Sequence, residues 1–498
     1  MNKLMQQIQT KDSETVNGMI TNSTTNSGLL DLFFTVAAMR SRSDAEVITK
    51  FSHAFDEDKE LAMRMLFWAR DIRGGQGERR IFRVITKWLT KNHAEIMEQV
   101  LHFIPEYGRW DDLFKLVGIN KSVDKLIAQI TQKGLIDKNV KMLCAKWMPR
   151  EKSAKKGLAI KMANLLNVSR KEYRKLCSGN SQTIETLMSS GNWKNIEFAK
   201  IPSIAIKKYR KSLSNHLPNE FVEFLENVKK GTQKVHAETL YPYDIIRPAY
   251  IDRYSYQSDT KIFDMSRLTQ IERDLLDAQW KALPDYFDGN KTNILPVIDT
   301  SASMYSAHTG GVAPLVISVS LGFYLAERNS GKFKDYFMTF TNKPSVVKMT
   351  GSTIEDKLNS MAEADMGFST DLEALFKSVL DAGIKGRVPE EDMPKALLIV
   401  SDMEFNSCVS RPSDTAFEMI ERMYADAEYE LPTIIFWRVN VLSSDGNCPV
   451  KFDKQNVVLI SGASPSNLKY IFSTEQLNPY NVMMKVLEND RYSQITLF

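Results

Sequence analysis

The side chains best suited to chemistry lie directly after an apolar run. Residues 294–298 are apolar and strand-forming, and they lead into Asp299, with Ser301 and Ser303 following at alternate positions. In an open α/β sheet, ligands bind just outside the carboxyl ends of the strands. A carboxylate and two hydroxyls at such a point are hard oxygen ligands, which suit a divalent cation. The sequence therefore predicts a cation site here, above all for Mg²⁺, with Ca²⁺ and Mn²⁺ as alternatives.

Two later segments carry side chains that fit the same site. A polar, glycine-containing loop, 365–371, holds Thr370 and precedes a helical run. The apolar run 396–400 then leads through Ser401 to Asp402 at another predicted strand end. Either aspartate taken alone is equally typical of a helix N-cap or a turn. The three segments in this order favour a shared cation site at one edge of a sheet.

This order resembles the metal-ion-dependent adhesion site of von Willebrand factor A domains, over about residues 290–498. The resemblance implies a cation held partly through water, with one position left for an acidic group from a partner protein. The usual loop of that site reads Gly-Thr, whereas two residues separate Gly367 from Thr370 here, so Ser369 is an alternative ligand. The residues that match the metal-site positions are Asp299, Ser301, Ser303, Thr370 and Asp402.

Strand-like and helical runs alternate through the C-terminal part of the chain. Such alternation predicts βαβ units and a mainly parallel sheet. Near-continuous Val, Ile and Leu in 397–400 and 434–436 is typical of strands that are covered on both faces. We therefore predict a doubly wound, Rossmann-like α/β domain of the von Willebrand A type over residues 289–498. The expected strands are 293–300, 335–341, 345–349, 395–401, 433–439 and 457–461.

The composition sets the outer limits. Of 498 residues, 43% are hydrophobic and 25% charged, which is ordinary for a globular protein. No apolar run approaches the ~18 residues of a membrane span, so no membrane association is expected. Four cysteines are too few and too scattered for a disulfide framework or a zinc site. Reduced thiols and a cytoplasmic location are therefore expected.

The net charge of +4 is unevenly distributed along the chain. Between Lys141 and Lys175 there are eleven basic residues and two acidic ones. A second basic cluster occupies 207–211, and a third, within 70–83, surrounds a Gly-Gly-Gln-Gly break. Such segregation is typical of a surface that binds a polyanion. A set of solvated helix faces is the alternative, and the charges alone leave both readings open.

The N-terminal part is helical in pattern. Apolar residues recur at i, i+3 and i+4 in 61–72 and 81–89, and short breaks separate further runs of the same kind. Amphipathic helices paired in series predict an all-α solenoid of HEAT-like repeats over residues 1–288. The pattern does not decide whether the repeats close into a ring or form an open arc.

Helical repeats with basic surfaces, followed by an A domain, resemble the Ro ribonucleoprotein autoantigen family, whose helical module is called TROVE. The chain is similar to a separate branch of Ro-like proteins. The resemblance implies that small structured RNAs and single-stranded RNA ends bind the helical part, which closes into a ring in Ro proteins. The segments that carry the similarity are 70–79, 108–113, 146–151, 171–176, 201–205, 240–244 and 401–405.

Lysine and arginine supply most of the affinity in such binding by neutralising phosphates, and aromatic stacking adds to it. Trp147, Tyr173 and Tyr209 lie among the basic residues and are candidates for stacking, with core packing as the alternative. The predicted RNA contacts are Lys146, Arg150, Lys152, Lys155, Lys156, Arg170, Lys171, Arg174, Lys207 and Lys208.

Catalysis is not expected, because the sequence assembles no acid–base pair and no activated nucleophile. Cys408 follows the predicted cation site but has no base nearby in sequence. Three functions stay open. They are a monomeric, non-catalytic RNA-binding scaffold with a Mg²⁺-dependent partner site, a protein-interaction scaffold without RNA, and a metal-dependent nuclease. Hydroxyls outnumber carboxylates in the predicted ligand set, which disfavours phosphoryl chemistry at the metal, so RNA binding is the preferred hypothesis.

Overall fold

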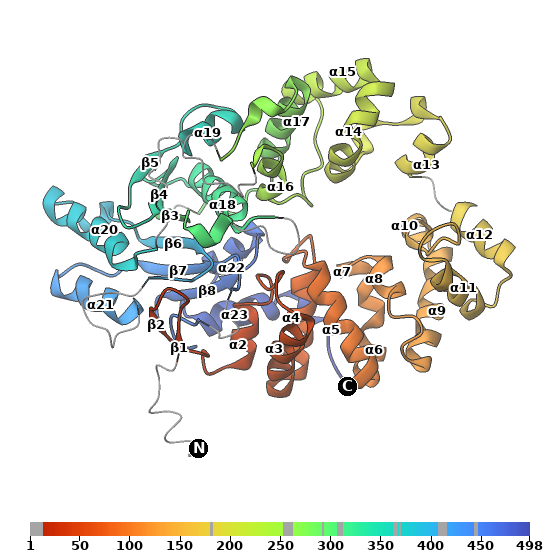
Figure 1. Ribbon diagram of the computed structural model, residues 1–498, viewed down its shortest axis with the longest axis horizontal. Helices are drawn as coiled ribbons and strands as arrows, with labels where there is room; N and C mark the ends of the chain where they lie inside the picture. Colours follow the sequence, from red (N-terminus) through yellow and green to blue (C-terminus); the bar gives the residue numbers. More distant parts are fainter. Residues whose placement is uncertain are drawn as a thin grey trace. The chain divides into compact units, whose positions relative to one another are not determined.

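The computed structural model describes residues 13–179, 183–251, 262–290, 293–305, 312–361, 367, 370–406, 416–442 and 447–498 (Figure 1). Within these residues, a helical N-terminal region precedes a C-terminal region built on a six-stranded mixed sheet. The predicted order, α followed by α/β, is confirmed at this level. None of the described helices has both the length and the apolar character that a bilayer crossing requires.

The chain folds as two compact units, each of which is assembled from two stretches of sequence. We call them the sheet unit, which contains the six strands, and the helical unit. The sheet unit comprises Met1–Ala62 and Leu240–Asn489, and the helical unit comprises Met63–Thr239 and Asp490–Phe498.

The compact units are assembled differently from the predicted sequence domains, 1–288 and 289–498, because elements from both sides of residue 288 pack around the sheet. Helix α16 (Pro242–Ile246) precedes that division, yet it packs on α18 (Pro314–Arg328), which follows it. Helix α2 (Gly28–Phe33), near the start of the chain, packs on α23 (Pro479–Leu487), near its end. Apolar surfaces from both ends of the sequence are therefore buried around one sheet.

The sheet has the strand order β5-β4-β3-β6-β7-β8 (Figure 1). Strand β5 runs antiparallel to β4, and the other neighbours are parallel. At the centre, Ile298 of β3 pairs with Val400 of β6, so the carboxyl ends of these two strands lie side by side. The strands are β3 (Ile294–Asp299), β4 (Tyr336–Phe340), β5 (Val346–Lys348), β6 (Ala396–Ser401), β7 (Thr433–Arg438) and β8 (Val457–Ser461).

The core of the sheet unit lies around the sheet and extends to its edge strand β8. Every residue of β3, β6 and β8 is buried, which accounts for their continuous apolar sequences. Helix α18 packs on β3, β4 and β6. Gly322 permits this close approach, because a Cβ at that position would lie 2.4 Å from Cδ1 of Ile298. The remaining helices of at least five residues are α3 (Asp44–Glu57), α17 (Gln270–Lys281), α19 (Ile354–Ser360), α20 (Leu372–Gly386), α21 (Ala416–Asp426) and α22 (Leu468–Phe472).

The first described residues form a short antiparallel hairpin, which we call the N-terminal hairpin. It pairs β1 (Ser13–Glu14) with β2 (Ile20–Thr21). Its turn makes an antiparallel bridge between Gly18 and Asn406, within the sheet unit. The hairpin therefore lies against the segment that follows β6.

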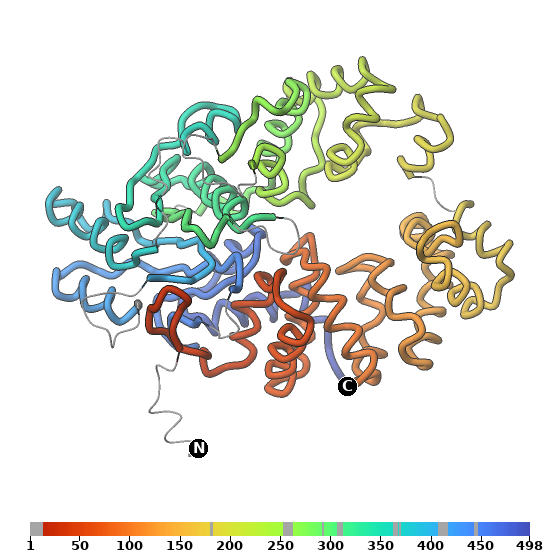
Figure 2. Tube along the Cα trace, in the orientation of Figure 1, coloured from red at the N-terminus to blue at the C-terminus, as the bar shows by residue number. Residues whose placement is uncertain are grey.

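The helical unit consists of short helices that contact their neighbours in sequence (Figure 2). Examples are the pairs α5 with α6, α9 with α10, and α14 with α15. The helices are α4 (Lys59–Arg70), in which the division between the units falls, α5 (Arg79–Asn92), α6 (Ala94–Val100), α7 (Ile104–Tyr107), α8 (Trp110–Phe114), α9 (Lys121–Ile136), α10 (Lys141–Trp147), α11 (Lys156–Leu165), α12 (Arg170–Gly179), α13 (Ile184–Ser189), α14 (Ser203–His216), α15 (Pro218–Lys229) and α24 (Asp490–Ser493).

The Gly-Gly-Gln-Gly segment forms the tight connection between α4 and α5. A Cβ on Gly75 would lie 1.8 Å from the carbonyl oxygen of Trp68, so only glycine fits there. Gly77 has a φ of +67°, in the left-handed region that favours glycine. Asp71 holds the turn, because its Oδ2 accepts hydrogen bonds from Gly74 N at 3.1 Å and from Arg491 Nε at 2.5 Å.

Candidate functional site

Asp299 ends the central strand β3 and is fully buried. Its Oδ1 accepts a hydrogen bond from the backbone N–H of Ser301 at 2.8 Å, which turns the chain sharply after the strand. Its Oδ2 accepts one from the hydroxyl of Ser401 at 2.5 Å. Ser401 is the last residue of β6. The side chain of Asp299 is therefore fixed toward the neighbouring strand.

Asp402 follows Ser401 and is also fully buried. Its Oδ1 accepts a hydrogen bond from Glu404 N at 3.2 Å. Its Oδ2 is buried and has no hydrogen-bond partner among the residues that the structure describes. An acceptor left in this state is costly, so it calls for a missing donor or ion. Met403 has a φ of +68°, which is unusual for a residue with a side chain and marks strain beside the carboxylate.

The two carboxylates act on each other electrostatically. Burial, followed by the nearby charge of Asp402, raises the pKa of Asp299. Burial also raises the pKa of Asp402, and this effect outweighs the opposing influence of the Ser303 hydroxyl. Ser303 thus lies close to Asp402, although it makes no hydrogen bond of standard geometry with the orphaned Oδ2. Two buried carboxylates placed together favour a bound cation, because a cation would remove their mutual repulsion.

Three hydroxyls were predicted as further ligands, and the structure places two of them with the carboxylates. Ser301 is buried, and its hydroxyl lies 3.1 Å from that of Ser303. The hydroxyl of Thr370 is buried too, but it donates to the carbonyl oxygen of Glu404 at 2.9 Å. Thr370 therefore lies beside the segment after β6, and its lone pairs remain able to accept or coordinate.

The predicted ligand set contains more hydroxyl groups than carboxylates, which distinguishes it from most metal sites in proteins. Within the described residues, no three histidine, cysteine, aspartate or glutamate side chains are grouped so as to hold a metal ion. The predicted set has only two such side chains, with hydroxyls making up the rest. The orphaned Oδ2 of Asp402 and the paired serine hydroxyls fit a hard cation. Ser369 and Cys408 lie outside the described residues.

Glu404 ties the candidate site to the N-terminal hairpin. Its Oε2 accepts a hydrogen bond from Val16 N at 2.8 Å, and its Oε1 accepts one from Asn447 Nδ2 at 2.9 Å. Its carbonyl oxygen accepts a further bond from Asn17 Nδ2 at 2.6 Å. Burial raises the pKa of Glu404, while the hydrogen bonds that its carboxylate accepts from Val16 and Asn447, and the charge of the buried Arg438, oppose the rise. Glu404 lies only two residues after Asp402, but its hydrogen-bond partners come from distant parts of the sequence and had no sequence signal.

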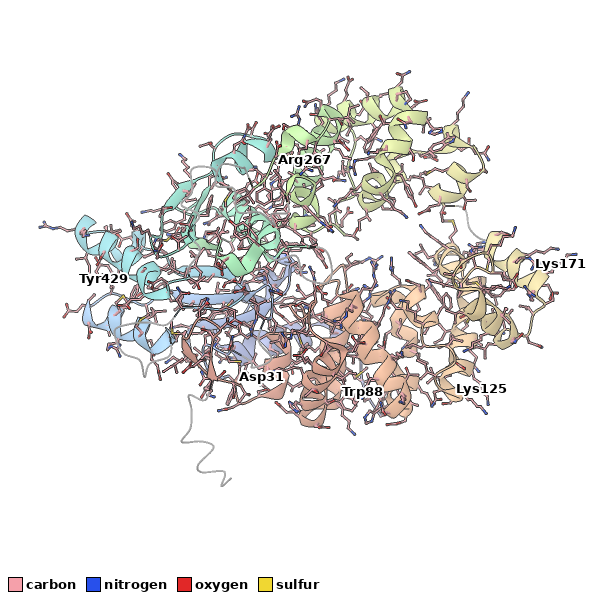
Figure 3. The ribbon with its side chains drawn as sticks, in the orientation of Figure 1. Asp31, Trp88, Lys125, Lys171, Arg267 and Tyr429 are labelled. Carbon is pink, nitrogen blue, oxygen red and sulfur yellow. The ribbon has the colours of Figure 1, made fainter. Side chains whose placement is uncertain are left out.

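The predicted RNA contacts all lie in the helical unit, and they differ in their availability. Lys152, Lys155 and Lys156 are exposed, as the chain enters α11. Lys171 is exposed on α12, where Figure 3 shows its side chain directed away from the helix. Lys208 is also exposed. Their exposure leaves these five side chains accessible to a ligand.

The other members of the predicted set are less available, and three of them make ion pairs. Glu151 accepts from Arg170 Nε at 2.7 Å and from Arg174 Nη1 at 2.8 Å. Lys146 Nζ lies 3.1 Å from Glu185 Oε2. Arg150 Nη2 donates to the carbonyl oxygen of residue 145 at 3.1 Å, and Lys207 is half-buried on α14. The local acids reduce the positive charge that these residues present to a ligand.

The three aromatic candidates for stacking also differ. Tyr173 is buried, and its hydroxyl donates to the carbonyl oxygen of Pro149 at 3.0 Å, so it belongs to the core. Tyr209 is half-buried, with Nζ of Lys208 4.7 Å from its ring centroid. Trp147 is half-buried as well, and the guanidinium of Arg109 lies 4.3 Å from its ring centroid.

Comparisons with known proteins place the chain in a family. The model described as domain of unknown function DUF2828 matches residues 15–156 and 136–288, which together exceed half of the chain. The chain therefore belongs to this family. A second model, domain of unknown function DUF7788, matches residues 293–495. Uncharacterized protein L728 of Acanthamoeba polyphaga mimivirus is 29% identical over 524 residues, which cover 96% of this chain and 87% of the viral protein.

Proposed function

We propose that this protein is a non-catalytic RNA-binding protein of the Ro-like type. In this proposal the helical part is a TROVE-like module of HEAT-like repeats, and the sheet belongs to a von Willebrand A domain with a metal-ion-dependent adhesion site. The helical surface binds structured and single-stranded RNA, and the A domain captures an acidic group of a protein partner. A cytoplasmic monomer is part of the same proposal.

The observation that carries the proposal is the buried pair Asp299 and Asp402. Neighbouring parallel strands bring the two carboxylates together, and Oδ2 of Asp402 is left without a partner among the described residues. A divalent cation, Mg²⁺ before Ca²⁺ or Mn²⁺, would be held by Asp299, Ser301, Ser303 and Asp402, with Thr370 reached directly or through water. The cation would supply a position at which a carboxylate from a partner completes the coordination shell.

Exposed basic side chains support the RNA part of the proposal. Lys152, Lys155 and Lys156 lie close together in sequence, and none of the three has an ion pair within the described residues. Clustered lysines attract the phosphate backbone whatever the base sequence, and their contribution falls steeply with salt. Lys171 and Lys208 extend the exposed positive charge over α12 and α14.

A protein-interaction scaffold is the second candidate, and the ion pairs favour it. Glu151 bridges Arg170 and Arg174, and Glu185 pairs with Lys146. Local acids that neutralise basic side chains weaken a phosphate-binding surface. Under this alternative the helical unit would bind an acidic protein, with the cation site serving the same partner or another one.

RNA binding across a salt series distinguishes the two candidates. We expect wild-type protein to bind single-stranded and stem-loop RNA at low salt, as measured by fluorescence anisotropy. Substituting Lys152, Lys155 and Lys156 by Gln should flatten the slope of log K against log salt by about 2 for single-stranded RNA, or about 0.7 for each lost contact. The matched control substitutes three exposed lysines of the sheet unit, Lys334, Lys385 and Lys485, by Gln.

The control variant should retain the wild-type slope. Undetectable binding at low salt would reject the RNA hypothesis in favour of the scaffold. Strong binding that is equally insensitive to both triple substitutions would show that RNA is held elsewhere. RNA shortening that needs both Mg²⁺ and Asp299 would instead establish a nuclease.

A further inference from the structure

A network of arginines and aspartates joins α4, α5 and α8 in the helical unit. Oδ2 of Asp112 accepts from Arg70 Nη2 at 2.7 Å, and Oδ1 of Asp112 accepts from Arg83 Nε at 2.5 Å. Arg83 Nη2 also donates to Asp111 Oδ2 at 2.8 Å. Arg109 Nε lies 3.1 Å from the other oxygen of Asp111. Three arginines therefore converge on two buried carboxylates.

Three further cations lie near this network. Arg79, Lys115 and Lys155 are exposed. Partial burial lowers the pKa of Arg79, and the charges of Arg70 and Arg83 lower it further. Partial burial likewise lowers the pKa of Lys115, with Arg83 and Lys155 among the causes. The cations are thus close enough to repel one another.

The charge balance of this cluster is strongly positive. We call it the arginine cluster, and its electrostatic contacts join six cationic side chains to two carboxylates. Four of its members, Arg109, Asp111, Asp112 and Lys115, lie in or at the ends of one short helix, α8. The cluster comprises Arg70, Arg79, Arg83, Arg109, Lys115, Lys155, Asp111 and Asp112.

The guanidinium of Arg109 lies between an aromatic ring and a carboxylate. Arg109 stacks on the ring of Trp147 at 4.3 Å and is anchored by Asp111. Burial, followed by the charge of Arg79, lowers the pKa of Arg109 to about 10. A planar guanidinium that is already ordered loses little entropy when it binds an oxyanion. An anion with several oxygens would relieve the repulsion among the cations.

We propose that the arginine cluster binds a terminal phosphate monoester of RNA. The cluster concentrates its charge at one place, whereas a phosphodiester carries a single negative charge and continues along a chain. A phosphate monoester carries about −1.5 to −2 charges near neutral pH and three oxygens for charge-assisted hydrogen bonds. This inference rests on the proposed function, because it specifies which part of the RNA the helical unit recognises.

The proposal is tested with one single-stranded RNA sequence in three forms: with a 5′-phosphate, with a 3′-phosphate and with hydroxyls at both ends. Binding is followed by fluorescence anisotropy of an internal dye, using the full chain. We expect one phosphorylated form to bind about tenfold more tightly than the hydroxyl form. A tenfold gain in affinity is what one to two additional charge-assisted hydrogen bonds to the phosphate would provide. The two phosphorylated forms identify which end is recognised.

The double variant Arg79→Gln/Lys115→Gln separates this site from the general RNA contacts. Both side chains are exposed, neither is among the RNA contacts predicted from sequence, and the buried pairs around Asp112 remain intact. The phosphate preference should vanish, while hydroxyl-ended RNA keeps most of its affinity. The matched control Lys121→Gln/Lys125→Gln removes the same charge from α9, on which Figure 3 shows Lys125 pointing outward. It should retain the preference.

Each result decides a different question. Equal affinity for all three RNA forms would overturn the terminal-phosphate inference and leave RNA binding standing. Undetectable binding of every form would overturn both. Inorganic phosphate should compete for the phosphorylated RNA, and an oligoglutamate peptide that competes equally well would show a site for acidic chains instead. Charge-preserving Arg79→Lys/Lys115→Arg should restore the preference, which would rule out a folding defect as the cause of its loss.

Discussion

The hydroxyl of Ser401 donates a hydrogen bond to Oδ2 of Asp299 at 2.5 Å, across two neighbouring strands. The same hydroxyl accepts a hydrogen bond from Met403 N at 3.0 Å. Ser401 therefore sets the position of the Asp299 carboxylate and also turns the chain that carries Asp402. Because the turn forces Met403 into the left-handed region, the geometry around the two aspartates is maintained at a conformational cost of about 1 kcal/mol or more.

Removing one of the two buried charges should have opposite effects with and without a cation. In the presence of a chelator, Asp402→Asn should stabilise the sheet unit by about 1 to 3 kcal/mol, because it abolishes the repulsion between two buried carboxylates. The change also replaces the buried, unpartnered Oδ2 by part of a neutral amide, which costs less to bury than a charged carboxylate. Adding Mg²⁺ should raise the thermal midpoint of the wild type and leave that of the variant unchanged.

Thermal unfolding in EDTA and in a Mg²⁺ series measures both effects. The exposed Asp453→Asn variant removes the same charge outside the site and should behave like the wild type. A wild-type midpoint that responds to none of Mg²⁺, Ca²⁺ and Mn²⁺ would contradict the cation site. Ca²⁺ and Mn²⁺ belong in the series because the same oxygen ligands accept them.

Glu404→Gln should have the reverse effect of Asp402→Asn, although both changes replace a carboxylate by its amide. Both oxygens of Glu404 accept hydrogen bonds, one from Val16 N and one from Asn447 Nδ2. An amide group there would oppose a donor to a donor in either orientation. We expect a loss of about 1 to 3 kcal/mol in the free energy of unfolding, which urea titration would measure.

The exposed Glu475→Gln variant is the control for this change and should leave stability within about 0.5 kcal/mol of the wild type. If Glu404→Gln were as stable as the wild type, the contact between the N-terminal hairpin and Glu404 would contribute nothing to folding. The effect should be the same with chelator and with Mg²⁺, because Glu404 is not placed among the ligands.

The sequence located the sheet because buried parallel strands have a distinctive composition. All six expected strands are present, and the continuous Val, Ile and Leu of β6 reflects helices that leave no face in water. The direction of β5 could not be foreseen, because its three residues carry no signal for antiparallel pairing. The division into units was also beyond reach, because it depends on which distant apolar helices meet, such as α2 and α23.

The candidate site was predictable to the extent that strand order brings residues together. Asp299 ends one strand and Asp402 directly follows another, and the two strands proved to be parallel neighbours whose carboxyl ends meet. The hydrogen bond from Thr370 to the carbonyl of Glu404 depends on loop conformation and had no sequence signal. Charge counting found the basic residues of α12, but it could not show that Glu151 would bind two of them.

Gly75 is predicted to tolerate no side chain. In Gly75→Ala the new methyl group would lie 1.8 Å from the carbonyl oxygen of Trp68, a backbone atom that cannot move aside without distorting α4. We expect a loss of about 3 kcal/mol or more in the stability of the helical unit, measured by urea unfolding. Gly157→Ala is the control, because a Cβ there meets nothing within 4 Å. Equal stability of the two variants would contradict the tight turn between α4 and α5.

The carboxylate of Asp112 should make the helical unit sensitive to acid. Burial by itself would raise the pKa of Asp112, but the charges of Arg70 and Arg83 outweigh it and hold the pKa below its usual 3.8. A carboxyl group whose pKa is lower in the folded protein stabilises the fold above its unfolded-state pKa. That stability is lost as the pH falls below about 3.8 and through the lower folded-state pKa.

Urea unfolding from neutral pH to pH 3 tests this prediction on Asp112→Asn. At neutral pH the variant should lose about 3 kcal/mol, because the buried Arg70 and the half-buried Arg83 lose their shared counter-charge. Its stability should then fall less than that of the wild type on acidification, so that the two curves approach each other. The exposed Glu223→Gln variant should follow the wild-type curve. Parallel curves for Asp112→Asn and the wild type would show that Asp112 is not ionised beside its arginines. The arginine cluster would then carry one negative charge fewer, and hence a larger positive excess, than we have assigned to it.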